Sequence, residues 1–143
     1  MAVRIGLDLG EKRVGVAVTD EGGLMAFPLK TLEIRGRNHL LEELKPLIEQ
    51  YRVSEIVVGL PKTLRGEIGP AAQAVQETVA WMRERLQIPW IFWDERLTSQ
   101  EVERVLREAE VTGSRRKEFR DQLAAQRILQ SYLESRSRPA PGE

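Results

Sequence analysis

Cysteine is absent from the 143-residue chain, and histidine occurs only once, as His39. Without cysteine there is no disulfide scaffold, no thiolate metal site and no thiol nucleophile. With one histidine, a polyhistidine zinc site cannot be assembled from this chain either. Any chemistry must therefore rest on carboxylates, hydroxyls or a bound metal ion.

The chain also lacks net charge and long apolar runs. Lys and Arg number 22 and Asp and Glu number 22, so no global field draws the protein to nucleic acid or to a membrane. A site for a polyanion would have to be a local patch. No stretch approaches the roughly 20 apolar residues of a membrane span, and the N-terminus has no apolar signal region. We expect a cytoplasmic protein that makes no membrane contact.

Length and composition predict one globular domain. The chain is 41% hydrophobic and 31% charged, which is the balance of an ordinary globular protein, and 143 residues leave no room for a second domain. We expect this domain to cover residues 1–135. The last residues, 136–143, which contain Arg-Pro-Ala-Pro, are expected to form a disordered tail.

Apolar periodicity predicts an α/β fold. Val3–Leu9 and Arg13–Thr19 read as a β-hairpin. A third strand is expected within 24–34, where Pro28 favours either an edge strand or a strand that starts after the proline. Helices and strands then alternate, which predicts a mixed five-stranded sheet with helices on both faces. The later elements are expected as follows: a helix over 38–51 with Pro46 inside it, a strand over 55–60, a helix over 71–86, a strand over 90–93, a helix started by the Thr98–Glu101 capping box, a basic loop over 113–117 and a helix over 118–134.

Asp8 is the first candidate for chemistry, because a carboxylate inside an apolar strand is disfavoured unless a cation compensates it. The alternative places Asp8 on the solvent face of an edge strand, with Ile5 and Leu7 inward. Asp94 and Glu95 directly follow a hydrophobic strand, at the sheet edge where ligands gather in open α/β folds. Alternatively, these two acids only favour the positive end of the helix after them.

Asp121 belongs to the inward stripe of the last predicted helix, where alanines would allow a close approach to the sheet. The alternative is an ion pair with Arg116, Arg120 or Arg127, or a favourable interaction with the helix dipole. If Asp8, Glu95 and Asp121 converge, they form an oxygen-only site suited to Mg²⁺ or Mn²⁺. Such a site activates water for in-line displacement at phosphorus, which predicts phosphodiester hydrolysis with these three residues as catalytic and metal-binding groups.

Basic residues near the proposed acidic site are candidates for binding the phosphates of a nucleic acid. They are Lys12, Arg13, Arg96, Arg115, Arg116 and Lys117. Singly, Lys12, Lys62 and Arg65 are expected to be solvated loop residues. The tryptophans Trp81, Trp90 and Trp93 are expected to pack in the core or between helix and sheet rather than to stack on bases.

Four motifs, in this order, resemble those of the YqgF (RuvX) family and cover nearly the whole chain. They are Gly6-Leu7-Asp8-Leu9-Gly10 with the Lys12–Ala17 segment, Val57-Val58-Gly59-Leu60-Pro61, Asp94-Glu95-Arg96-Leu97-Thr98, and Asp121-Gln122-Leu123-Ala124-Ala125. The resemblance implies a ribonuclease H-like fold related to Holliday junction resolvases. It also implies an endonuclease that matures the precursor of 16S ribosomal RNA, with its acidic site at Asp8, Glu95 and Asp121.

Three questions stay open on the sequence. Asp94 rivals Glu95 as the second acid. The substrate is expected to be RNA, but four-way DNA is an alternative that would require paired sites in a homodimer rather than a monomer. A nucleic-acid-binding factor without catalysis, for example one associated with transcription, is the alternative from another class. Nucleotide phosphotransfer on an actin-like fold is disfavoured, since 143 residues cannot supply two lobes around ATP.

Overall fold

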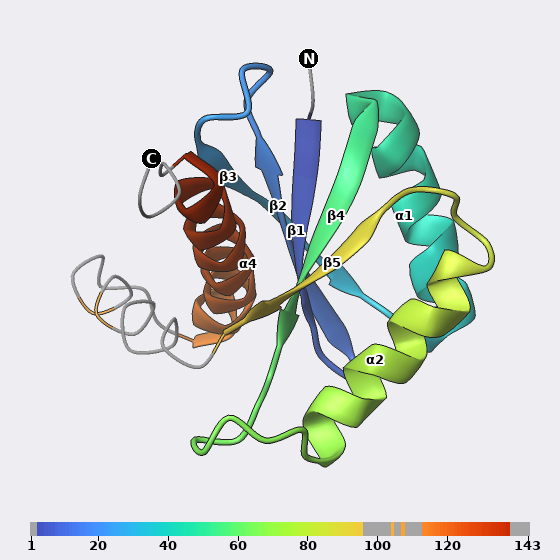
Figure 1. Cartoon of the computed structure of the whole chain (residues 1–143), viewed down its shortest axis with the longest axis vertical. Helices are drawn as coiled ribbons and strands as arrows, with labels where there is room; N and C mark the ends of the chain where they lie inside the picture. Colours follow the sequence, from blue (N-terminus) through green and yellow to red (C-terminus); the bar gives the residue numbers. More distant parts are fainter. Residues whose placement is uncertain (1–2, 96–103, 105–106, 108–112, 138–143) are drawn as a thin grey trace, which may run out of the picture.

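The computed structural model describes residues 3–95, 104, 107 and 113–137. Its centre is a five-stranded sheet in the order β3-β2-β1-β4-β5 (Figure 1). The strands are β1 (Val3–Leu9), β2 (Arg13–Thr19), β3 (Ala26–Glu33), β4 (Val53–Leu60) and β5 (Trp90–Asp94). β1 pairs antiparallel with β2 and parallel with β4, so the predicted mixed sheet and its opening hairpin are confirmed.

The edge position of β3 agrees with the proline inside it. Pro28 lies opposite Ala17 of β2, next to a register shift between Val16 and Ala17. Proline cannot donate a ladder hydrogen bond, so it is tolerated at an edge or a bulge. Of the two alternatives for Pro28, the edge strand is therefore confirmed.

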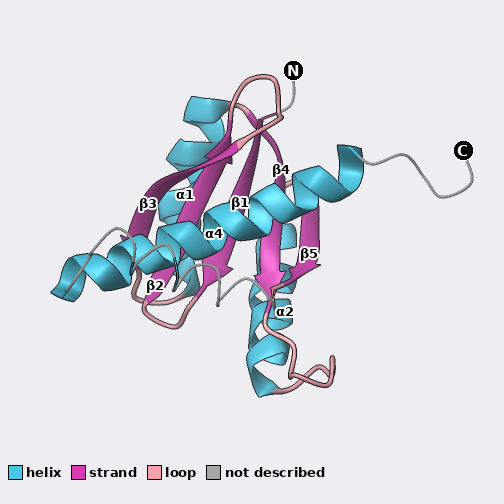
Figure 2. Ribbon diagram, turned by 90° about the vertical axis from the view of Figure 1, so that its left-hand side faces the viewer, coloured by secondary structure: helices cyan, strands magenta, loops and turns pink. Residues whose placement is uncertain are grey.

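Helices cover both faces of the sheet. α1 (Arg37–Tyr51) and α2 (Pro70–Arg83) lie on one face, and α4 (Gly113–Ser137) lies on the other (Figure 1). α4 runs across the strands and contacts each of them (Figure 2). Among the described residues, no helix is both long and apolar enough to cross a membrane.

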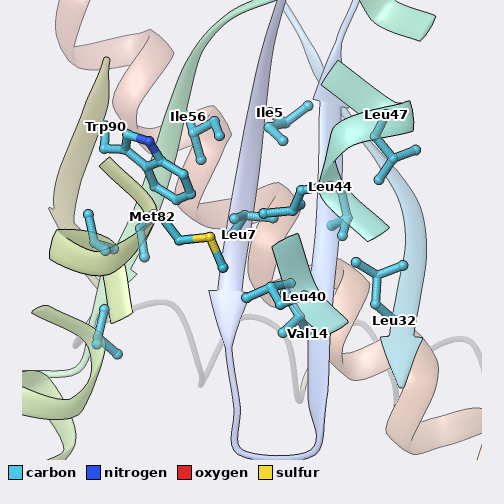
Figure 3. Close-up of a cluster of buried hydrophobic side chains, with 14 of the residues drawn as sticks. Ile5, Leu7, Val14, Leu32, Leu40, Leu44, Leu47, Ile56, Met82 and Trp90 are labelled. Atoms are coloured by element: carbon cyan, nitrogen blue, oxygen red, sulfur yellow. The ribbon is translucent and has the colours of Figure 1, made fainter. Parts of the chain in front are cut away.

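Two apolar clusters hold the three layers together. The larger one lies between the sheet and the helices α1 and α2, and includes Ile5, Leu7, Leu44 and Met82 (Figure 3). The smaller one lies under α4. Its members are Ala17, Ala26, Val57, Ala125, Ile128, Leu129, Tyr132 and Leu133. A strand alternates its side chains between faces, so β2 and β4 each contribute to both clusters.

The tryptophans pack as expected. Trp90 is buried in the larger cluster, and Trp81 packs against its edge. Trp93 meets the ring of Tyr132 edge to face at 5.5 Å and donates a hydrogen bond to the Ser131 hydroxyl.

The last helix differs from its prediction at both ends. The prediction of a basic loop over 113–117 is wrong, because these residues form the first turns of α4. Arg116 and Lys117 are good helix formers, and they continue a helix that packs across the whole sheet. α4 also continues to Ser137, so Arg136 and Ser137 do not belong to a tail. Residues 138–143 and most of the helix predicted after Thr98 lie outside the described residues.

Candidate active site

Asp8 lies near the end of β1, on the face that α4 covers. Gly6, two residues earlier on the same face, lies against Leu129 of α4. Ile5 and Leu7 point to the opposite face, into the cluster under α1 and α2. β1 is moreover a central strand. The interpretation of Asp8 as a solvent-facing residue of an edge strand is therefore wrong.

Glu95, directly after β5, meets Asp8 through a hydrogen bond between the two carboxyl groups. Its backbone N–H donates to the carbonyl of Leu60, which fixes it at the end of β4. The Glu95 side chain then lies over Gly59, and a Cβ at position 59 would collide with Oε2 of Glu95. Glycine in the Val57–Pro61 motif thus provides the space for this carboxyl.

Burial dominates the electrostatics of the pair. Desolvation, with a smaller contribution from the charge of Asp121, raises the pKa of Asp8 to about 6, although the hydrogen bond from Glu95 lowers it in part. Desolvation, together with the charge of Asp8, raises the pKa of Glu95 to about 8. Near neutral pH Glu95 therefore keeps its proton and donates it to the Asp8 carboxylate. Asp94 contributes a smaller like-charge effect on Glu95, so the acid that joins Asp8 is Glu95 rather than its rival.

Asp121 lies beside this pair on α4, but its carboxylate is engaged elsewhere. Arg13 Nε donates to Asp121 Oδ2 at 2.7 Å, across 108 residues of sequence. The Asp121 carbonyl sits directly over Gly15, the residue opposite Asp8 in the hairpin. Glycine at position 15 therefore allows Asp121 to approach the sheet. From the sequence, this close approach was expected from the alanines of the helix instead. The Arg13 partner was also missed there.

The chemistry of the pair fits a divalent cation. Asp8 and Glu95 supply only oxygen donors, and burial and neighbouring carboxylates raise their pKa values, an effect that a bound cation would offset. Within 3–95 and 113–137, no set of three acidic or histidine side chains stands in an arrangement that could hold a metal ion.

The predicted basic residues fall into separate groups. Lys12 and Arg13 line an open groove between the β1–β2 turn, the end of β3 and the start of α1. Arg35 and His39, which the sequence analysis did not single out as binding residues, line the same groove. Two further predicted residues, Arg116 and Lys117, lie on α4. Arg96 and the side chain of Arg115 lie outside the described residues.

Comparison with solved structures defines the class of the fold. Thermus thermophilus RuvC in complex with a Holliday junction substrate matches with a TM-score of 0.57 at 15% identity, over 95% of this chain and 96% of that chain. The Fowlpox virus resolvase, in complex with Holliday junction DNA, matches with a TM-score of 0.60 at 10% identity, over 95% and 99%. The fold is thus the ribonuclease H-like fold of the resolvases.

The chain belongs to the RuvX family. The family model, described as Holliday junction resolvase, matches residues 2–135. A relative from Desulforudis audaxviator, named "Putative pre-16S rRNA nuclease", is 47% identical over 92% of this chain and 94% of its own length. A relative of the same name from Thermoanaerobacter pseudethanolicus is 45% identical over 92% and 95%. The chain is accordingly a nuclease, a hydrolase that acts on phosphodiester bonds.

Proposed function

We propose that the chain is a metal-dependent endonuclease that acts in the cytoplasm and matures the precursor of 16S ribosomal RNA. The observation that carries the metal site is the buried Asp8–Glu95 carboxyl pair at the ends of β1 and β5. The names of the relatives support the substrate.

In this proposal Asp8, Glu95 and Asp121 hold one or two Mg²⁺ or Mn²⁺ ions. When bound, the cation supplies a Lewis acid that activates water and stabilises charge on the phosphodiester. Asp8 and Glu95 give up their shared proton as the cation binds, since carboxylate ligands must be deprotonated. The cover of α4 over Gly6 and Gly15 limits access of bulk water to this side of the sheet. Lys12 and Arg13 bind the phosphates that flank the scissile bond.

The test is cleavage of a precursor RNA by the Asp8→Asn variant in Mn²⁺ or Mg²⁺. Loss of a residue that only supports a metal ligand costs about 10- to 100-fold, so loss of the ligand itself should cost more than about 100-fold. Lys62→Gln, in the loop after β4, is the matched surface control and should keep its rate. Cleavage by Asp8→Asn at the wild-type rate would overturn the assignment.

A four-way DNA junction is the second candidate substrate, favoured by the description of the family model. Cutting two opposed strands of such a junction requires two sites, and hence a homodimer rather than a monomer. Parallel assays on precursor RNA and on a four-way junction, with the oligomeric state measured by sedimentation, separate the two. Paired cuts in the junction by a dimer would favour the resolvase; RNA cleavage by a monomer favours the ribosomal RNA precursor.

A further inference from the structure

The Arg13–Asp121 ion pair joins two residues to which the proposed function gives different partners. Asp121 should hold a cation, and Arg13 should bind a phosphate. In this structure they satisfy each other at 2.7 Å, with 39% of the Arg13 side chain and 16% of the Asp121 side chain exposed. The pair therefore keeps Asp121 from completing the acidic set.

Asp121 lies close to the Asp8–Glu95 pair, within the span of one pair of facing residues in the hairpin. The Asp121 backbone rests on Gly15, and Gly15 lies directly opposite Asp8 in the hairpin. Residues that face each other in this way have Cα atoms only about 4.5–5.5 Å apart. The charge of Asp121 is already felt at Asp8, which agrees with this proximity.

Arg13 is open to a ligand from the other side. It lines the groove together with the cationic Lys12 and Arg35 and the acidic Glu11 and Glu33, so an incoming anion would meet three cationic side chains against two carboxylates there. Asp121, and to a smaller extent Glu33 and Glu118, raise the pKa of Arg13. Arg13 therefore stays charged whether or not Asp121 remains its partner.

We propose that Arg13 is a positioning residue that holds Asp121 away from the Asp8–Glu95 pair until a nucleic-acid phosphate replaces the carboxylate on the guanidinium. The inference rests on the proposed function. It makes binding of nucleic acid and binding of the cation mutually favourable, because each releases the same ion pair and such coupling is reciprocal. The cation site is then completed only when a strand is present.

The first test uses a fluorescently labelled single-stranded RNA in EDTA, where no metal is present to support cleavage. Asp121→Asn should bind this RNA about two- to fivefold more tightly than the wild type, the range expected for release of a partly exposed ion pair. In the Arg13→Gln background the same substitution should give no gain. Glu11→Gln, which removes an acid from the same groove, controls for charge alone. Equal gains from Asp121→Asn and Glu11→Gln would overturn the inference.

The second test measures Mn²⁺ binding to the free protein by calorimetry. Arg13→Gln should tighten Mn²⁺ binding about two- to fivefold, and Lys12→Gln, which removes a neighbouring positive charge without touching Asp121, should do so less. In the Asp121→Asn background, Arg13→Gln should have no more effect than Lys12→Gln, since a double-mutant cycle isolates the pair. Asp121→Ser replaces Asp121→Asn if circular dichroism shows that the latter does not fold.

The two proposals fail in different ways. If Asp121→Asn and Asp8→Asn both leave Mn²⁺ binding unchanged, the metal site of the proposed function is wrong and the inference falls with it. If both variants weaken Mn²⁺ binding but Arg13→Gln does no more than Lys12→Gln, only the inference is wrong. Absence of RNA binding in EDTA by wild type and variants alike also overturns the inference, and leaves the cleavage assay to decide the function.

Discussion

At the scale of single residues, the carboxyl groups of Asp8 and Glu95 make the metal-free protein sensitive to pH. Their ordinary pKa values of 3.8 and 4.5 rise on folding to about 6 and about 8. Between these values the folded state binds more protons than the unfolded state. The free energy of unfolding therefore falls as the pH rises from about 4 to about 8, so stability present at low pH is lost through this window.

We expect the Tm of the metal-free protein to fall between pH 5 and pH 8.5, by about 5 °C or more. Glu95→Gln should flatten this dependence, because the glutamine has no proton to lose. Added Mn²⁺ should raise the Tm at pH 8.5, since the cation binds the folded state. Thermal scans followed by circular dichroism measure all three effects. A wild-type slope unchanged in Glu95→Gln would show that this pair does not cause it.

The choice between Glu95 and Asp94 is also decided at this scale. Glu95 is hydrogen-bonded to Asp8, whereas Asp94 raises the pKa of Glu95 through its charge. Glu95→Gln should therefore lower metal-dependent cleavage more than about 100-fold, and Asp94→Asn should lower it less than about threefold. Initial rates at saturating Mn²⁺ make the comparison. The reverse order would assign the ligand to Asp94.

At the scale of elements, the contact between α4 and the β1–β2 hairpin positions Asp121. A Cβ at position 15 would collide with the backbone of Asp121, so the helix would have to move away. Gly15→Ala should lower the free energy of unfolding by about 1–3 kcal/mol, as expected for overpacking, and should also lower cleavage. Gly22→Ala is the matched control, because its nearest neighbour there is the Asp20 carboxylate at 3.8 Å. Urea denaturation and cleavage rates for both variants test this, and equal effects would contradict it.

The far end of α4 is held by a polar network that should serve stability alone. The Tyr132 hydroxyl donates to Glu55 at 3.0 Å and accepts from Arg136 at 2.8 Å, and Arg4 also pairs with Glu55. Glu55 lies toward the start of β4, whereas the acidic site lies at the strand ends. Tyr132→Phe should cost about 1 kcal/mol of unfolding free energy and leave the cleavage rate unchanged. A loss of rate without a loss of stability would contradict this separation.

At the scale of the whole molecule, local patterns predict the sheet well and the last helix less well. The hairpin strands Val3–Leu9 and Arg13–Thr19 have the predicted bounds because alternation and a short turn are local signals. The segment over 113–117 was predicted as a loop from its Gly113 and its run of basic residues. Packing of α4 across all five strands overrides that weak local preference.

The candidate site shows the same limit. Asp8 could be selected from sequence, because it is an acid inside an apolar strand. The acids Asp94 and Glu95 could be selected as a pair, but the contact with Asp8 is what singles out Glu95. The Arg13–Asp121 pair could not be, because it joins residues 108 positions apart and depends on the glycine that lets α4 rest on β2. Contacts of this kind arise from tertiary packing and leave no periodic signal in the chain.

The central claim is that the buried carboxyl pair of Asp8 and Glu95 holds a divalent cation. The most direct measurement is a crystal soaked in Mn²⁺, with the metal located by its anomalous scattering. The account predicts a manganese peak in contact with the carboxylates of Asp8 and Glu95. A peak elsewhere on the protein, or none at this pair under conditions that support cleavage, would contradict it.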